Sequence, residues 1–327
     1  MDLGPEIAQA QTRTSTRGPA DYDLGIPRDE QLQHVVYVDR LIDQLDPLAR
    51  KLLSRPFDPA EMDDQVCFSQ IHPWFTSRHL PSTTRSEHDS EDWVFSVLVR
   101  PAMEALALLQ RPSNNLQRVP LGDFPNVSSA GGSCPIPDAI FVFGDRDDVR
   151  ATIEIKTHKA LLTDDGEFGR DLRSFQPLMN SWPNMPIGRA TRFIWPSRRT
   201  WGSSLKPPPL PCDDKILIQV WSQMHSKAVD FAMLSSYRST FFFHKQGTTL
   251  FISRPYTRMN APVLATFTFL ALACGRIPRS SLKLPEVDTQ WYLPHISSGG
   301  QNLVGIDWRT TPDAYYGETV NGEEVSE

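Results

Sequence analysis

Residues 137–156 read PDAIFVFGDRDDVRATIEIK. Two runs rich in β-branched and aromatic residues flank a polar segment whose glycine and aspartates favour a turn. The pattern predicts two antiparallel strands, at residues 139–143 and 150–155, joined as a hairpin. Because side chains alternate across a strand, Glu154 shares one face with Lys156. The isoleucines between and beside them occupy the opposite face, which we expect to pack on the core.

The same hairpin brings two carboxylates together. Asp138 directly precedes the first strand, and a turn at about residues 144–148 returns the chain so that Glu154 lies beside it. Converging carboxylates suit Mg²⁺, which binds through one or two of them together with water and substrate phosphate. Lys156 would then hold the attacking water or the charge developing on the phosphate. Glu154 and Lys156 could instead form an exposed salt bridge on a strand, but Asp138 at hairpin distance favours a site.

This arrangement resembles the signature of the PD-(D/E)XK nuclease superfamily. Pro137-Asp138 is followed by Glu154-Ile155-Lys156, with Glu154 sixteen residues after Asp138. The resemblance implies a restriction-endonuclease-like core and a Mg²⁺ or Mn²⁺ ion bound by Asp138, Glu154 and the carbonyl of Ile155. It also implies that Asp138, Glu154 and Lys156 are catalytic.

Two flanking helices extend the resemblance. In the superfamily a helix before the hairpin carries an acid, and here Glu91 begins an apolar stripe and is the expected metal ligand. Asp89 or Asp92 could take that place, and Glu91 could simply interact with the helix dipole. A later helix often carries a glutamine, and Gln219 is the corresponding catalytic candidate. Gln219 could equally be a core amide with its hydrogen bonds satisfied.

The resemblance covers roughly residues 88–275. The stretch from Gln219 to His244 resembles fungal PD-(D/E)XK-like proteins, including regions found beside fungal-specific protein kinases. The implied function is a metal-dependent nuclease-type phosphodiesterase acting on DNA or RNA. The alternative is a catalytically inactive module of the same fold that binds nucleic acid or a protein partner such as a kinase.

The expected fold class is α/β (α+β), with a central mixed sheet flanked by helices and loop insertions at 111–133 and 159–214. The chain is expected to divide into a disordered leader 1–28, an N-terminal helical extension 29–87, the core 88–275, and a C-terminal extension 276–327. Helices are expected at 29–53, 91–110 with a kink or break at Pro101, 215–230 and 261–274. Short strands are expected at 231–235, 240–244 and 249–253.

Charge is distributed unevenly along the chain. The formal net charge is −6, and removing the five acids of the acidic tail 310–327 leaves −1 for the rest. A basic segment interleaved with aromatic residues is the expected nucleic-acid-binding region, since cations and aromatic rings suit phosphates and bases. Its members are Arg189, Arg192, Trp195, Arg198 and Arg199. The alternative interpretation is a solvated loop whose aromatic side chains pack on the body of the protein.

The cellular location is expected to be intracellular, in the nucleus or cytoplasm, without membrane insertion. The polar N-terminus lacks the apolar region of a secretory signal, and the longest apolar run, 261–274, is too short to span a bilayer. The four cysteines are scattered and show no zinc or redox spacing.

Overall fold

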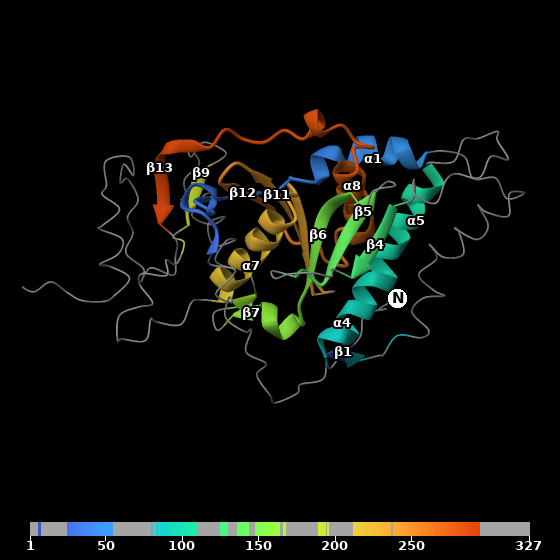
Figure 1. Cartoon of the computed structure of the whole chain (residues 1–327). Coiled ribbons are helices and arrows are strands. Elements are labelled where there is room, and N and C mark those ends of the chain that lie inside the picture. Colours follow the sequence, from blue (N-terminus) through green and yellow to red (C-terminus); the bar gives the residue numbers. More distant parts are fainter. Residues whose placement is uncertain are drawn as a thin grey trace, which may run out of the picture.

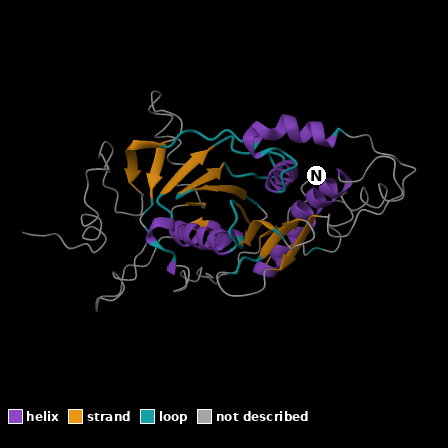
Figure 2. Cartoon of the chain, turned by 45° about the horizontal axis from the view of Figure 1, so that its top comes forward, coloured by secondary structure: helices purple, strands orange, loops and turns teal. Residues whose placement is uncertain are grey.

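A computed structural model describes residues 6–7, 25–54, 80, 83–84, 86–109, 125–129, 136–143, 148–163, 166–167, 189–193, 195, 212–236 and 238–294. Within these ranges the chain forms a nine-stranded mixed sheet with helices on both sides, which confirms the α/β class (Figures 1 and 2). No helix in these ranges is long and apolar enough to cross a membrane.

The sheet contains both parallel and antiparallel pairs of strands. The strands follow the order β13 (Asp288–Pro294), β9 (Arg189–Arg192), β2 (His34–Val38), β12 (Thr249–Ser253), β11 (Thr240–Gln246), β10 (Phe231–Ser235), β6 (Val149–Ile155), β5 (Ala139–Phe143) and β4 (Pro125–Ser129). The pairs β6–β10, β12–β2 and β9–β13 are parallel, and the other neighbours are antiparallel. Two small sheets pair β1 (Glu6–Ile7) with β3 (Thr83–Thr84) and β7 (Leu162–Thr163) with β8 (Gly166–Glu167).

The helices cover both faces of this sheet. They are α1 (Asp46–Leu53), α4 (Glu87–Val94), a π-helical turn (Phe95–Val99), α5 (Arg100–Leu109), α7 (Cys212–Ser226) and α8 (Pro262–Ala273). Single 3-10 turns occupy Arg28–Glu30, Asp43–Leu45, His158–Leu161 and Arg279–Ser281. Helices α1, α5 and α8 pack together on one face, while α7 lies against β6 and β10 on the other (Figure 1).

Two hydrophobic cores result, one on each face. Ile153 and Ile155 of β6 belong to the core built around α8, which confirms that the isoleucine face of the hairpin packs on the core. The opposite face, which carries Glu154, is covered as well, because α7 and the neighbouring strands form a second core there with Leu234 and Trp221. Glu154 therefore does not project into solvent from a half-covered strand.

The hairpin prediction is confirmed. Strands β5 and β6 are antiparallel, Ala139 pairs with Ile153, and a register shift follows Phe141. The three predicted strands after α7 are also present, at β10, β11 and β12, and the apolar helix is α8. These elements depend on local alternation and turn residues, which the sequence displays directly.

The helix predicted at 29–53 is wrong. His34–Val38 forms strand β2 between β12 and β9, with Val36 buried in one core and Val35 in the other. A strand buried on both faces loses the polar alternation that would distinguish it from a helix. Helix α1 begins only at Asp46, where Pro47 suits the first turn. The first part of the predicted extension 29–87 therefore belongs to the main sheet.

Two other regions, 159–214 and 276–327, contribute strands that the predicted layout did not include. The insertion 159–214, expected to be irregular, contains β9 and so supplies a strand to the sheet, and the C-terminal extension supplies β13. The insertion 111–133 contains the short strand β4.

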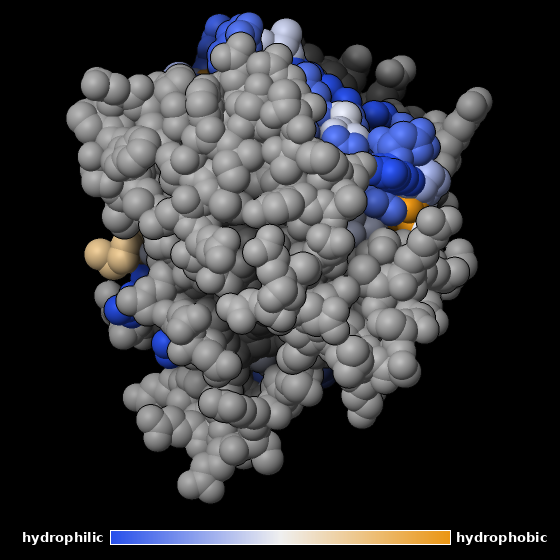
Figure 3. All heavy atoms as spheres, turned by 90° about the vertical axis from the view of Figure 1, so that its left-hand side faces the viewer, coloured by the Kyte–Doolittle hydropathy of each residue, from blue (hydrophilic) through white to orange (hydrophobic). Residues whose placement is uncertain are grey.

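The face on the left of Figure 1 is mostly hydrophilic where the described residues reach its surface (Figure 3). The segment 1–28, predicted to be a disordered leader, lies largely outside the described residues, and the acidic tail 310–327 lies wholly outside them.

Helix 87–109 passes through Pro101 without a break. Pro101 has no N–H, so one intrahelical hydrogen bond is missing. In the π turn directly before it, the Arg100 N–H donates to the Phe95 carbonyl, five residues back. The wider turn accommodates the proline, so the expected disturbance takes the form of a π turn and the helix continues.

Replacing Ala228 by Gly should raise the free energy of unfolding by about 0.5 to 1 kcal/mol. Ala228 follows α7 with a φ of 51°, a left-handed conformation that costs energy for any residue with a Cβ. Urea denaturation would measure the gain. Ala271→Gly, inside α8, is the control and should lower stability by about 1 to 2 kcal/mol, because it loses helix propensity and a buried methyl group. A destabilised Ala228→Gly variant would contradict this account of the turn.

Candidate active site

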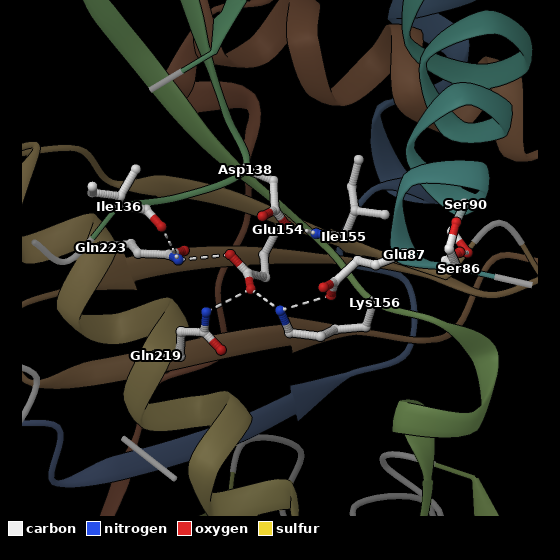
Figure 4. A network of polar contacts seen from close by, with 10 residues as sticks. All are labelled: Ser86, Glu87, Ser90, Ile136, Asp138, Glu154, Ile155, Lys156, Gln219 and Gln223. Atoms are coloured by element: carbon white, nitrogen blue, oxygen red, sulfur yellow. Dashed lines mark hydrogen bonds and ion pairs between the residues drawn. The ribbon is translucent and has the colours of Figure 1, made fainter. Parts of the chain in front are cut away.

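The hairpin places Asp138 and Glu154 opposite each other. Ala139 pairs with Ile153, so continuing the register by one residue sets Asp138 against Glu154. The Oδ2 atom of Asp138 accepts a hydrogen bond of 2.6 Å from the Ile155 N–H, which fixes this carboxylate at the end of β6 (Figure 4). The predicted convergence of the two acids is therefore what the backbone pairing produces.

Glu154 is enclosed by hydrogen-bond donors. Its side chain is 1% exposed, and its Oε1 accepts from the Lys156 ammonium and, at 2.6 Å, from Nε2 of Gln219. Its Oε2 accepts from Nε2 of Gln223, also at 2.6 Å. Both glutamines come from α7, so this helix both buries the carboxylate and supplies the amides that replace its lost hydration.

Lys156 sits at the junction of three elements. It directly follows β6, and its backbone N–H donates to the Ser235 carbonyl of β10 at 2.9 Å. Its side chain is 11% exposed, and the ammonium contacts Glu154 and, at 3.3 Å, Oε1 of Glu87 in α4. Figure 4 shows the ammonium between these two carboxylates.

The cluster carries an excess of negative charge in a buried setting. Burial, together with the charge of Glu154, raises the pKa of Asp138 to about 7, although Lys156 and the Ile155 N–H act in the opposite direction. Burial also raises the pKa of Glu154 despite its contacts with Lys156 and Gln223. Burial alone would lower the pKa of Lys156, but Glu154, Asp138 and Glu87 outweigh it and raise that pKa. A cation in this region would relieve the repulsion between the acids.

The helix acid that reaches the cluster is Glu87, not the predicted Glu91. The helix begins four residues earlier than expected, because Ser86 and Asp89 form a capping box, with Ser86 Oγ accepting from the Asp89 N–H and Asp89 Oδ2 from the Ser86 N–H. Glu91 instead contacts Nδ1 of the exposed His88 at 3.3 Å. Glu87 and Glu91 are four residues apart and therefore share a face of the helix. The signal that could have located Glu87 is the Ser-x-x-Asp pattern of Ser86 and Asp89, which marks the start of the helix one residue before it.

Gln219 is where the sequence predicted it, and Gln223 joins it. Gln223 lies one helical turn after Gln219 on the same face of α7, so the spacing could have identified it. Its Nε2 also contacts the Ile136 carbonyl at 3.4 Å, which ties α7 to the chain just before Asp138. Its Oε1 is buried and has no hydrogen-bond partner among the described residues.

The structure describes only part of the basic segment that was predicted to bind nucleic acid. Trp195 and Phe193 are only 8% and 4% exposed, and both belong to the core under α7. Trp195 is therefore not available to stack on a base in this conformation, and its burial agrees with the alternative interpretation that the aromatic side chains pack on the body of the protein. Arg189 and Arg192 lie in β9, where the structure describes the backbone but not these side chains. Arg198 and Arg199 lie outside the described residues.

Within the described ranges, no group of three or more His, Cys, Asp or Glu side chains is arranged to hold a metal ion. The chain was also compared with known proteins. No family model, curated protein or solved structure matches it. Function is therefore inferred from the geometry and charge of the cluster formed by Asp138, Glu154, Lys156, Gln219, Gln223 and Glu87.

Proposed function

We propose that this chain is a Mg²⁺-dependent phosphodiesterase of the PD-(D/E)XK type, with a restriction-endonuclease-like core, acting on DNA or RNA. The observation that carries the proposal is the placement of Asp138 opposite Glu154, with the Lys156 ammonium on Glu154. Two acids and a lysine meeting at one end of a hairpin are suited to chemistry on a phosphate group.

The residues of the cluster fit a divalent cation in type and charge. Asp138, Glu154 and the carbonyl of Ile155 would be the ligands, all hard oxygen donors of the kind Mg²⁺ prefers. Burial, and after it the charge of Glu154, raises the pKa of Asp138, and a bound cation would stabilise the ionised form against both. The Lys156 ammonium and the two glutamine amides already occupy the oxygens of Glu154. At least one of these donors would have to move aside for Glu154 to bind the cation.

Each side chain then has a distinct chemical role. A bound Mg²⁺ would lower the pKa of a coordinated water and offset negative charge on the phosphate. Lys156, whose pKa is raised, remains an ammonium and stabilises charge on a phosphate oxygen, so it does not act as a general base. Gln219 and Gln223 hold the Glu154 carboxylate in a fixed orientation from α7.

A second candidate function has its own observation in favour. Both oxygens of Glu154 are hydrogen-bonded by side chains of this chain, so this carboxylate has its hydrogen-bonding needs met without a metal. Such an arrangement suits a module that keeps the fold and binds nucleic acid or a protein, such as a kinase, without turnover. The two candidates differ in whether a divalent cation binds.

Purified protein should cleave DNA or RNA in the presence of Mg²⁺ or Mn²⁺ and not in EDTA. Asp138→Asn should abolish the cleavage, because Asn replaces an anionic ligand with a neutral one of the same size. Glu91→Gln is the matched control and should keep activity, since Glu91 contacts His88 instead of the cluster. Gel electrophoresis of labelled DNA and RNA substrates measures this. Cleavage equal in wild type and Asp138→Asn, or none with either metal, would exclude the phosphodiesterase.

A further inference from the structure

The Lys156 ammonium has an inner and an outer partner. Glu154, on its own strand, is 1% exposed, whereas the Glu87 side chain, from α4, is 49% exposed. The contact with Glu87 measures 3.3 Å between Nζ and Oε1. A lysine side chain has many rotamers, so a second anchor from a different element restricts where its charged end can lie.

Glu87 is itself held in place. It is the first residue of α4, and the capping box of Ser86 and Asp89 fixes that turn at 2.9 and 3.1 Å. Ser90 Oγ adds a hydrogen bond of 3.3 Å to the Ser86 carbonyl.

The neighbouring acids of α4 have other roles. Asp89 is engaged in the capping box, and Glu91 contacts His88. Of the acids at the start of this helix, Glu87 is the one whose contact with the cluster is seen (Figure 4). The start of α4 thus delivers one carboxylate to the exposed side of Lys156, the side from which a substrate phosphate would arrive.

We infer that Glu87 is a positioning residue for Lys156, holding its ammonium at the exposed side of the cluster through the ion pair between α4 and β6. The role in catalysis rests on the proposed phosphodiesterase function, while the positioning itself can be measured without substrate. Glu87 acts through Lys156 and touches no reacting atom, so it is not assigned as a catalytic residue.

The test is the reactivity of the Lys156 amine in the metal-free, full-length chain. Trace labelling with acetic anhydride, followed by mass spectrometry of peptides, gives the rate at Lys156 relative to the exposed Lys51 across pH 8 to 11. Glu87→Gln should raise the relative rate roughly twofold to fivefold, as expected for the loss of one half-exposed ion pair. Glu87→Gln should also shift the pH profile of Lys156 labelling toward lower pH, because more of the amine is then unprotonated at each pH.

Three variants make the result specific. Glu91→Gln on the same helix face should leave the Lys156 rate unchanged, and Glu87→Asp should recover part of the wild-type protection. Ser86→Ala, which removes the cap, should raise the Lys156 rate less than Glu87→Gln does. Equal Lys156 rates and pH profiles in Glu87→Gln, Glu91→Gln and wild type would overturn the inference.

Labelling and cleavage fail independently. Loss of Lys156 protection in Glu87→Gln together with no metal-dependent cleavage by wild type would support the positioning and exclude the phosphodiesterase. Cleavage by wild type with no change in Lys156 labelling in Glu87→Gln would support the phosphodiesterase and exclude the positioning role of Glu87. Melting temperatures of all variants, measured alongside, show whether a change in labelling comes from local repositioning or from unfolding, and labelling that only follows unfolding counts against the inference.

Discussion

Lys156→Met should lower the free energy of unfolding of the metal-free protein by about 3 to 5 kcal/mol, the usual cost of leaving one partner of a buried ion pair uncompensated. Methionine keeps most of the side-chain volume, so the loss comes from the charge. Glu154 remains 1% exposed, and only the neutral amides of Gln219 and Gln223 are left beside it. Urea denaturation at pH 8 in EDTA measures the difference.

A double-mutant cycle identifies the source of that loss. Glu154→Gln combined with Lys156→Met removes both charges and should recover much of the stability, because no unpaired buried ion remains. Lys51→Met at an exposed position is the control and should change stability by less than about 0.5 kcal/mol. If Lys156→Met unfolds within about 1 kcal/mol of wild type, the Glu154–Lys156 ion pair is not a buried contact of the folded protein.

Metal-free protein should lose stability as the pH rises from about 5 to 7, and Asp138→Asn should remove the part of this loss that Asp138 causes. The pKa of Asp138 is about 7 in the folded chain, above the ordinary value near 4 of an unfolded one. Between these pH values the folded state keeps a proton that the unfolded chain has lost, so the contribution of Asp138 to stability is greatest at low pH and is lost as the pH rises to about 7. Thermal melts at pH 5, 6, 7 and 8 in EDTA would follow the decline.

The same variant tests the cation. Mg²⁺ or Mn²⁺ should raise the melting temperature of wild type at pH 8, because a ligand that binds only the folded state stabilises it. The rise should disappear in Asp138→Asn, whose metal-free stability at pH 8 should equal or exceed that of wild type. An Asp138→Asn variant that is clearly less stable in EDTA would mean that Asp138 is a structural partner of Lys156 or Ile155, which would remove it from the metal site.

The elements that the sequence predicted correctly are those specified by nearby residues. The hairpin of β5 and β6 follows from a polar turn between two apolar runs, and its register then sets Asp138 opposite Glu154. Gln219 could be anticipated because the periodicity of α7 fixes which side chains face the sheet. These parts of the candidate site needed no information from distant residues.

The residues that were missed depend on packing between distant segments. Val35 and Val36 are both buried, so the stretch around them shows no polar alternation, and only pairing with β12 and β9 makes it a strand. The start of α4 was ambiguous because Ser86, Asp89 and Ser90 all suit an N-cap. The choice of Ser86 over the others moves the contacting acid from Glu91 to Glu87.

The parallel pairing of β2 with β12 has a consequence during synthesis. His34 pairs with Thr249, so β2 leaves the ribosome long before the strand that lies beside it exists. Its other neighbour, β9, pairs with it through Thr191 and Arg192, which also emerge late. At ordinary translation rates the delay to β12 is roughly 10 to 40 seconds. For most of that time an apolar strand has neither of its hydrogen-bonding neighbours, so the nascent chain exposes apolar surface that only the later strands cover.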